Sequence, residues 1–589
     1  MCGIVAVAGA GDRTREVLLD GLERIEYRGY DSAGLAIADD DLQVRKRAGS
    51  VADLAGPADD LPRGGAVGIG HTRWSTHGAP TDANAHPQVD CAGRVAVVHN
   101  GIVENAARLR STLVEAGHSI ESEIDTAVIP HLIEDEISAG ADAVVAVRAA
   151  VRRLDGTFAI AVAIAGSDRV IGVRHGTPLV VGIGDGTTYL ASDVPAVRPH
   201  TDRVCHLVDG DVVAIGPGSD RVTGLDGRSH ERPVETVDWE SNATGLGAYD
   251  HYMRKEIDEQ PRVVRQSLAG RIEDGRVDLD LEVQPDRVAL VGAGTSYHAA
   301  RFGARRFRAA GMPATADIAS EFATEPPPIE DALVVAITQS GETADTLAAL
   351  DAVEADTVAI TNGAGSTVTR AADHTLLIRA GPEVSVAATK SFTTSLVTLD
   401  LLVRDLTGVE TAGPAIDALG DLPEQIESVI DESAAAAVAS AIAESAAYIF
   451  LGRGLLVPVA LEGALKTTEL TYEHAEGFPA GEFKHGPLAL VSESTPVIAA
   501  VTGDGDHARK IVTNIEEIAA RGAPIVAVTD GESDIGRVAD HVLTIPTAPD
   551  GAAAVLATVQ LQLLAYHLAR DLDRPIDRPR HLAKSVTVE

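Results

Sequence analysis

The second half of the chain repeats a series of short apolar strands, and this repeat constrains the fold more than any other feature. Each strand runs into a loop rich in Gly, Ser or Thr, and a helical segment follows. Three strands recur in the same order after about 160–170 residues, which predicts two similar α/β domains. Continuous apolar strands between helices indicate parallel sheets covered on both faces. The pairs are residues 288–294 with 448–454, 333–338 with 496–502, and 357–362 with 524–530.

Residues 1–240 have a different pattern, in which short strands such as 94–98 and 158–164 alternate with Gly- and Asp-rich turns. This pattern predicts a layered α/β domain with antiparallel sheets. A polar stretch at 239–245 is predicted to be a linker, and a helical segment opens near residue 251. The expected organisation is a first domain at 2–240, a linker and helical connection at 241–280, repeated domains at 281–425 and 435–575, and a C-terminal tail at 576–589.

The chain is strongly acidic, because 87 Asp and Glu residues oppose 49 Lys and Arg residues and give a formal net charge of −38. The acidic residues are dispersed along the chain. Such a surface repels nucleic acid and anionic lipid, so we expect neither nucleic acid nor a membrane as a partner. Few of the basic residues are lysines. Dispersed carboxylates suit a protein that stays soluble where salt screens charge, and a salt-rich cytoplasm is therefore our hypothesis.

The chain also gives indications about its compartment. No apolar run approaches the roughly 20 residues that span a bilayer, and no charged leader precedes the first apolar strand. Cys2, Cys91 and Cys205 have no metal-ligand spacing, and one of them is left over in any disulfide scheme. Three cysteines in a long chain fit a reducing cytoplasm. We therefore expect a cytoplasmic protein with no metal and no other cofactor.

Cys2 is a candidate nucleophile. If Met1 is removed, Cys2 carries both a thiol and the free α-amine, which titrates near about 7.7–8 and can take up a proton at neutral pH. Asn100 and Gly101 follow an apolar strand and could supply a side-chain amide and a backbone N–H to an oxyanion. Alternatively, Cys2 is a small buried side chain at the start of a strand, and Asn100 and Gly101 form a hairpin turn.

Charged residues near these positions could hold a substrate. Arg73 and Asp125 offer opposite charges to the carboxylate and ammonium groups of an amino acid. A structural ion pair is the alternative for Arg73.

In the second half, residues 338–343 lie where an apolar strand ends and a helix is expected to begin. Hydroxyl groups and backbone N–H groups at such a point form an anion site, and a sugar phosphate would fit it. Residues 294–296 end another parallel strand, so they are expected at the same edge of the sheet. The alternative is ordinary helix capping by Ser or Thr.

Residues 461–473 are predicted to form a helix that carries Glu462, Lys466, Glu469 and Glu473 on one face. A solvated stripe of salt bridges is the alternative. The helix is expected to end near Gly477, and the segment that follows brings an imidazole close to a carboxylate and an amine. Four of the few lysines lie within these polar motifs, including one in the tail, which is expected to fold onto a site. They are Lys390, Lys466, Lys484 and Lys584.

The first-domain motifs resemble the class II glutamine amidotransferase domain of the N-terminal-nucleophile hydrolases, which has four αββα layers. The resemblance rests on residues 2–5, 27–34, 71–78 and 99–101. It implies that Cys2 forms a glutamyl thioester with its own α-amine as the base, and that Asn100 and Gly101 form the oxyanion hole. It also implies a glutamine-binding set and a gate for ammonia. These residues are Arg73, Thr76, His77 and Asp125 for glutamine, and Trp74 for the gate.

The remaining motifs resemble the paired, doubly wound sugar isomerase domains of the glutamine–fructose-6-phosphate aminotransferase (isomerizing) family, also called glucosamine-6-phosphate synthases. The resemblance implies that Lys584 forms a Schiff base with fructose 6-phosphate and that His485 opens the sugar ring. Glu469 would move the proton between C1 and C2, assisted by Lys466. The family resemblance also implies a homodimer and the internal passage of ammonia between the two sites. The residues implied to hold the sugar phosphate are Ser296, Thr338, Gln339, Ser340 and Thr343.

Three positions depart from the family pattern: Thr338 replaces a serine, Ala293 a cysteine and Ala388 a serine. The last change removes a side-chain hydroxyl contact.

Three other functions are weighed against this one. A glutamine-independent sugar-phosphate deaminase or isomerase would need only the second half of the chain. A non-catalytic sugar-phosphate-binding regulator would need neither Lys584 nor Glu469. An amidotransferase that acts on phosphoribosyl pyrophosphate would need an acidic pyrophosphate-binding strand, which the sequence does not contain.

Overall fold

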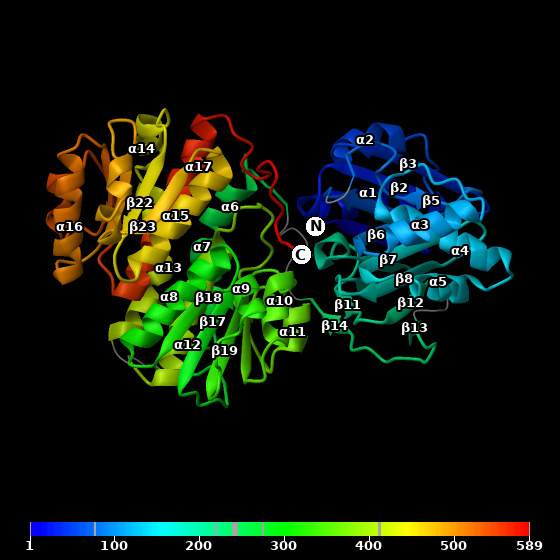
Figure 1. The fold of residues 1–589 in the computed structure, drawn as a ribbon, viewed down its shortest axis with the longest axis horizontal. Helices are drawn as coiled ribbons and strands as arrows, with labels where there is room; N and C mark the ends of the chain where they lie inside the picture. Colours follow the sequence, from blue (N-terminus) through cyan, green and yellow to red (C-terminus); the bar gives the residue numbers. More distant parts are fainter. Residues whose placement is uncertain are drawn as a thin grey trace. The chain divides into compact units, whose positions relative to one another are not determined.

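The computed structural model describes residues 2–75, 78–217, 221–237, 245–273, 276–409 and 414–587. The chain divides into two compact units, drawn in Figure 1. The first unit comprises Met1–Thr244 together with the tail Ala583–Glu589, and the second comprises Gly245–Leu582. The predicted linker at 239–245 lies, except for Gly245, outside the described residues.

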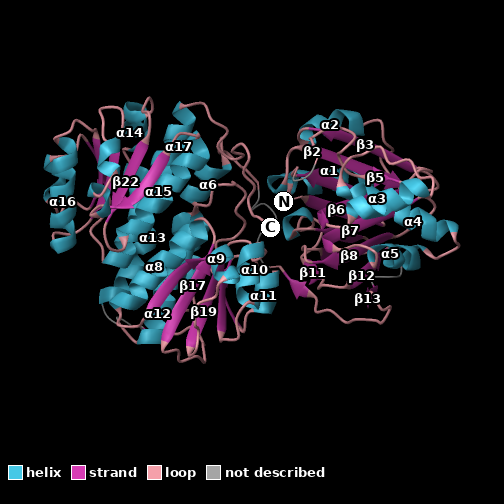
Figure 2. Ribbon diagram, viewed as in Figure 1, coloured by secondary structure: helices cyan, strands magenta, loops and turns pink. Residues whose placement is uncertain are grey.

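The first unit has four layers, because two antiparallel sheets pack face to face and helices cover their outer faces (Figure 2). This is the αββα arrangement that the family resemblance implied. One sheet has the order β14-β11-β9-β10-β1-β4-β2-β3 and the other β13-β12-β8-β7-β6-β5. The strands are β1 (Gly3–Ala8), β2 (Ser32–Ala38), β3 (Leu42–Ala48), β4 (Val67–Arg73), β5 (Gln88–Val89), β6 (Val95–Val103), β7 (Gly156–Ile164), β8 (Val170–His175), β9 (Val180–Ile183), β10 (Thr188–Ala191), β11 (Arg203–His206), β12 (Asp211–Ile215), β13 (Arg221–Gly224) and β14 (Glu235–Thr236).

Strand β1 shows why these strands are apolar along their whole length. Ile4 and Ala6 point into the core between the two sheets, whereas Val5 and Val7 pack against helix α1 on the outer face. Both faces are therefore buried, and no polar alternation is left in the sequence. The outer helices are α1 (Thr14–Arg24) and α2 (Val51–Ala58) on one sheet, and α3 (Ala106–Glu115), α4 (Val128–Ser138) and α5 (Ala143–Val151) on the other.

The second unit contains two five-stranded parallel sheets with the same strand order, which confirms the repeat predicted from the sequence. The first sheet has the order β18-β17-β19-β20-β21 and the second β23-β22-β24-β25-β26. Their strands are β17 (Arg287–Gly292), β18 (Ala314–Ile318), β19 (Ala332–Thr338), β20 (Thr357–Thr361) and β21 (His374–Leu377), then β22 (Tyr448–Gly452), β23 (Ala475–Pro479), β24 (Val497–Val501), β25 (Ile525–Thr529) and β26 (His541–Thr544).

Helices cover both faces of each of these sheets, as expected for continuous apolar strands. One large core joins the inner faces of the two domains, and it includes helices from both. The main helices are α6 (Tyr252–Asp258), α7 (Gln260–Leu268), α8 (Thr295–Ala309), α9 (Ala319–Thr324), α10 (Ala344–Asp351), α11 (Thr367–Ala371), α12 (Lys390–Thr407), α13 (Pro414–Glu432), α14 (Ala435–Ile442), α15 (Leu456–Thr471), α16 (Asp506–Ala519) and α17 (Asp550–Asp571).

Two details differ from the sequence analysis. The helix expected to end at Gly477 ends at Thr471, because residues 475–479 form β23, which pairs in parallel with β22. Among the described residues, α17 is long and apolar enough to cross a membrane, although no run of this kind was expected. However, 94% of its apolar window is buried inside the protein, so its composition reflects a core position.

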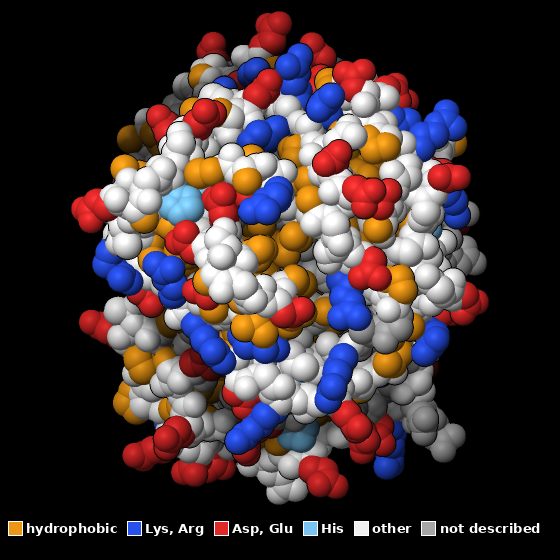
Figure 3. Space-filling model, turned by 90° about the vertical axis from the view of Figure 1, so that its right-hand side faces the viewer, with side chains coloured by type: hydrophobic (Ala, Val, Ile, Leu, Met, Phe, Trp, Pro, Cys, Tyr) orange, Lys and Arg blue, Asp and Glu red, His pale blue; other side chains and the backbone are white. Residues whose placement is uncertain are grey.

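Acidic side chains on the face drawn in Figure 3 are scattered among arginines, lysines and apolar side chains. The dispersion seen in the sequence therefore holds on this surface.

Candidate active sites

Cys2 lies immediately before β1, an inner strand of the first sheet. Its Sγ accepts a hydrogen bond from the backbone N–H of Trp74 at 3.4 Å and lies 3.6 Å from the carbonyl oxygen of that residue. The Cys2 carbonyl accepts two further hydrogen bonds, from Arg28 Nε at 3.1 Å and from Asn100 Nδ2 at 3.0 Å. Arg28 is itself buried and forms an ion pair with Asp193 at 3.2 Å. These contacts fix the backbone of Cys2 and with it the position of its thiol.

The side chain of Asn100 is oriented by His71, a residue that the sequence analysis did not select. The Nε2 atom of His71 lies 3.1 Å from Asn100 Oδ1 and 3.0 Å from the carbonyl oxygen of His99. Both partners are oxygens, so Nε2 carries a hydrogen and donates it. Burial lowers the pKa of His71 to about 3, and the imidazole is therefore neutral. His71 opens the motif at 71–78, but nothing in the sequence indicated that it orients Asn100.

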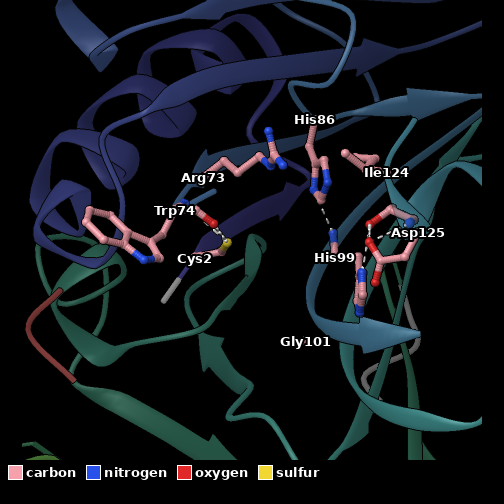
Figure 4. A pocket seen from close by; sticks show the side chains of 9 residues that line it. Cys2, Arg73, Trp74, His86, His99, Gly101, Ile124 and Asp125 are labelled. Atoms are coloured by element: carbon pink, nitrogen blue, oxygen red, sulfur yellow. Dashed lines mark hydrogen bonds between the residues drawn. The ribbon is translucent and has the colours of Figure 1, made fainter. Parts of the chain in front are cut away.

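A pocket opens beside Cys2, and Figure 4 shows the side chains that line it. In this view Cys2, Arg73 and Trp74 lie on one side, and the two histidines, Ile124 and Asp125 lie on the other. Arg73 donates to the carbonyl of Gly78 at 3.1 Å. The lining residues are Cys2, Arg73, Trp74, His86, His99, Gly101, Ile124, Asp125 and Thr126.

Backbone donors hold the Asp125 carboxylate in place. One oxygen accepts from the backbone N–H of Val103 and the other from that of Thr126, both at 2.8 Å. Gly101 lies at the wall of the pocket with φ 125°, and a Cβ there would come within 2.0 Å of the carbonyl oxygen of Thr157. Only glycine fits at this point. The structure thus brings together five of the residues selected for glutamine chemistry, whereas Thr76 and His77 lie outside the described residues.

Burial raises the pKa of the Cys2 thiol, although the N-terminal charge, the Trp74 N–H and the guanidinium groups of Arg73 and Arg28 act in the opposite direction. The thiol is therefore protonated at neutral pH and needs a base before it can attack an amide. A free α-amine on the same residue would supply that base.

The second site lies at the carboxyl end of β19. Thr338 ends this strand, and its Oγ1 forms a hydrogen bond of 2.8 Å with Oγ1 of Thr343, the N-cap residue of α10. Gly341 takes φ 72° between them, and a Cβ there would lie 1.9 Å from Ser366 Oγ. The side chain of Thr343 makes no capping hydrogen bond to the helix. Simple capping therefore does not explain this hydroxyl.

The carboxylate of Glu342, the acidic residue in this loop, bonds to the first residue of α11 and not to the N-terminus of α10. Glu342 accepts hydrogen bonds from the backbone N–H of Thr367 at 2.8 Å and from its hydroxyl at 2.7 Å. The Ser340 hydroxyl accepts from the Glu342 N–H at 3.1 Å, which leaves its own hydrogen available to a ligand. Hydroxyl groups and backbone donors are thus left to face an anion.

Helix α15 carries a buried charge cluster that links the two isomerase domains. Glu462 Oε2 accepts from His298 Nδ1 at 2.7 Å, and Oε1 accepts from the Thr295 hydroxyl at 3.0 Å. Lys466 Nζ lies 3.4 Å from Glu462 and 2.5 Å from Glu469. The predicted stripe is present for Glu462, Lys466 and Glu469, of which the first two are buried rather than solvated. The prediction for Glu473 was wrong, because α15 ends at Thr471 and Glu473 pairs with Arg574 beyond it.

The pKa values of this cluster follow from opposing effects. Burial alone would raise the pKa of Glu462, but Lys466, His298 and Thr295 outweigh burial and hold it below the ordinary value. Burial alone would lower the pKa of Lys466, but Glu462 and Glu469 hold it above the ordinary value. Lys466 is therefore an ammonium ion, which can polarise or orient a neighbour but cannot act as an amine nucleophile.

Three further lysines and His485 were also selected from the sequence. Lys390 is buried and pairs with Glu259 at 2.5 Å, whereas Lys484 pairs with Glu517 on α16. His485 is exposed, directly after a short 3-10 helix at Glu482–Lys484. Lys584 belongs to the tail that groups with the first unit.

Comparison with known proteins agrees with both units. Residues 71–199 match the Glutamine amidotransferase domain family, and residues 283–404 and 441–570 each match the SIS domain family. The chain is 45% identical to the glutamine–fructose-6-phosphate aminotransferase (isomerizing) of Halobacterium salinarum and 43% identical to that of Thermus thermophilus, over 100% of each chain. A solved structure of the C-terminal domain of glucosamine-fructose-6-phosphate aminotransferase from Francisella tularensis matches with a TM-score of 0.52 and 32% identity, over 56% of this chain and 99% of that one.

Proposed function

The chain belongs to the glutamine–fructose-6-phosphate aminotransferase (isomerizing) family, and we propose from this premise that it converts glutamine and fructose 6-phosphate into glutamate and glucosamine 6-phosphate. The observation that carries the proposal is the presence of two separately built sites in one chain. One is the pocket beside Cys2, and the other is the hydroxyl-rich end of β19.

In the first site, the α-amine of Cys2 takes the thiol proton, and Sγ attacks the amide carbon of glutamine. The resulting oxyanion is stabilised by the N–H of Gly101 and the carboxamide of Asn100. One hydrogen of that carboxamide bonds the Cys2 carbonyl, and the second is left for the oxyanion. Arg73 binds the substrate carboxylate, and Asp125 binds its ammonium group. Thr76 and His77 complete the glutamine-binding set, and Trp74 gates the passage of ammonia.

In the second site, the sugar phosphate binds the N-terminal end of α10. The donors are the hydroxyl groups of Thr338, Ser340 and Thr343 with nearby backbone N–H groups. Gln339 and Ser296 complete the contacts to the phosphosugar.

The remaining residues carry the chemistry on the sugar. His485 opens the ring, and Lys584 forms an imine with the open-chain ketose. Glu469 moves a proton between C1 and C2, and the Lys466 ammonium holds the carboxylate of Glu469 in place. Ammonia released at Cys2 then displaces the lysine, as an internal passage delivers it unprotonated. We place this chemistry in the cytoplasm and expect a homodimer, which light scattering of the purified protein would test.

The direct test is to assay glutamate and glucosamine 6-phosphate together after incubation with glutamine and fructose 6-phosphate. We expect equal amounts of both products. In Cys2→Ala, glutamine hydrolysis is lost, but isomerisation of fructose 6-phosphate to glucose 6-phosphate continues. Retained glutaminase activity in this variant would refute the assignment of Cys2 as the nucleophile. Sugar conversion by the wild type that releases no glutamate while glutamine is present would favour a deaminase or isomerase.

A further inference from the structure

A cluster of metal-ligand atoms lies on the helix-covered outer side of the second sheet of the first unit. Cys91 comes from the turn between β5 and β6, and His118 comes from the loop after α3. His131 and Glu134 are one turn apart on α4. The sequence analysis had found no metal spacing around Cys91, because these segments are separated along the chain and meet only in the fold.

Four atoms of this cluster converge on one point. Cys91 Sγ lies 3.5 Å from Nδ1 of His118 and 3.5 Å from Nδ1 of His131. Glu134 Oε2 lies 3.3 Å from His118 Nδ1 and 3.4 Å from His131 Nδ1. All of the ligand atoms lie within 4.8 Å of one another.

The four separations of 3.3–3.5 Å match the edges of a tetrahedron around a metal ion. Zinc lies about 2.0–2.3 Å from nitrogen, oxygen and thiolate ligands, so tetrahedral ligand atoms are about 3.3–3.7 Å apart. The two histidine rings are edge-to-face, with centroids 5.1 Å apart, and both present Nδ1 to the same thiol and carboxylate.

The carboxylate of Asp135 supports His118, the histidine of the cluster that does not lie on α4. Asp135 Oδ1 lies 2.9 Å from Nε2 of His118, so it accepts a hydrogen bond from that ring and fixes the tautomer in which Nδ1 carries a lone pair. A carboxylate behind a ligating histidine is a common feature of zinc sites, because it orients the ring and increases its basicity.

We propose that Cys91, His118, His131 and Glu134 bind one Zn²⁺ ion as a structural site of the glutaminase domain. One thiolate, two imidazoles and one carboxylate suit a borderline-soft divalent ion, and four protein ligands leave no open position for a substrate. Binding displaces the thiol proton of Cys91 to solvent, and no redox change is involved.

The site would stabilise the segment that leads to the glutamine pocket. His118 and His131 flank the stretch that contains Ile124 and Asp125, two residues of the pocket wall. Bound zinc ties the loop after α3, the β5–β6 turn and α4 together, and so anchors both ends of this stretch. Its effect on the catalytic site is therefore one of positioning, through Asp125.

The test uses the untagged full-length chain, stripped with a chelator and then titrated with Zn²⁺. We expect one zinc ion per chain by elemental analysis after dialysis, and a rise in the temperature of thermal unfolding when zinc is restored. Cys91 is exposed, so Cys91→Ser should fold normally and lose the bound zinc. Asp135→Asn should retain the site and weaken its affinity by about 10–100-fold, as expected for a carboxylate behind a ligand.

Two controls separate this site from incidental binding. Cys205→Ala removes a buried cysteine remote from the cluster, and His507→Asn removes an exposed histidine on α16. Both should keep one zinc ion per chain. Substitution by Co²⁺ should give a thiolate charge-transfer band that is absent in Cys91→Ser. The proposal is overturned if the wild type binds no zinc after titration, if Cys91→Ser and His131→Asn keep full stoichiometry, or if the cobalt form lacks that band.

Discussion

The two sugar isomerase domains have the same strand order, but the loops after their equivalent strands differ in charge. In the first domain, β19 ends in hydroxyl-bearing residues, and Glu342 is turned away onto Thr367. In the second domain, β24 is followed by Asp504 and Asp506, and Asp506 lies in the first turn of α16. A carboxylate in the first turn is favoured by the positive end of the helix and repels a phosphate group. In the proposed function, the phosphate therefore binds the first of the two domains and not the second.

The helices that follow β17 and β22, the first strand of each domain, also differ, and here the second domain carries the Glu and Lys residues of the buried cluster. Helix α15 of the second domain carries Glu462, Lys466 and Glu469, whereas α8 of the first domain supplies Thr295 and His298 as partners of Glu462. In the proposed function, the first domain binds the phosphate and the second supplies charged groups for proton transfer. A shared fold has been divided between two tasks, and the following predictions test that division.

The largest effect is expected at Lys584, which lies in neither isomerase domain. Lys584→Arg should reduce glucosamine 6-phosphate formation to background, because a guanidinium group stays protonated and cannot form an imine. Reduction with borohydride in the presence of fructose 6-phosphate should add a sugar to the wild-type C-terminal peptide and not to the variant. A sugar adduct on Lys390 or Lys466 instead would place the covalent step inside the duplicated fold.

A large effect on stability is expected at Glu462, which is 2% exposed. Glu462→Ala removes the carboxylate that Lys466 and His298 share. Loss of one partner of a buried pair costs about 3–5 kcal/mol, which is an upper bound here because Lys466 keeps Glu469. Denaturant unfolding at neutral pH measures this loss. The surface pair of Lys484 and Glu517 is the matched control, and Glu517→Gln should leave unfolding almost unchanged.

The same cluster predicts a pH dependence. The pKa of Glu462 is held below its ordinary value, so its contribution to stability is complete above the unfolded value of about 4.3 and is lost as the pH falls through the folded value. The pKa of Lys466 is raised, so its contribution is complete below about 10.4 and is lost as the pH rises through the folded value. Glu462→Gln should flatten the acid side of the stability profile, and an unaltered profile would contradict this account.

A smaller effect is expected at the phosphate loop. Ser340→Ala combined with Thr343→Ala should raise the KM for fructose 6-phosphate by about 10–100-fold, because each hydrogen bond to a charged oxygen contributes about 1.5–3 kcal/mol and water replaces part of it. Asp504→Ala combined with Asp506→Ala is the matched change in the second domain and should leave this KM unchanged. Equal effects of the two double variants would remove the distinction between the domains.

The smallest effect is expected from the salt concentration, which acts on the whole surface rather than on one contact. The dispersed acidic surface repels itself, so the temperature of unfolding should rise steadily with KCl concentration. Full stability in dilute buffer would contradict a salt-rich environment.

Local patterns in the sequence predicted much of this architecture. The three recurring strands in the second half and the layered first domain are both present, since each depends on periodicity within short segments. The contacts that orient the sites could not be predicted in this way. Glu462 meets His298 across 164 residues, and His71 meets Asn100 from a different sheet. Cys91 gains its histidine neighbours only when β5, α3 and α4 come together.

The central claim is that the nitrogen of the amino sugar comes from glutamine through one chain. The direct measurement is the isotopic composition of glucosamine 6-phosphate made from glutamine labelled with ¹⁵N in its amide, in the presence of excess unlabelled ammonium. The account predicts that the product carries ¹⁵N, because ammonia released at Cys2 reaches the sugar before it mixes with solvent. A product that carries the unlabelled nitrogen of the medium would contradict it.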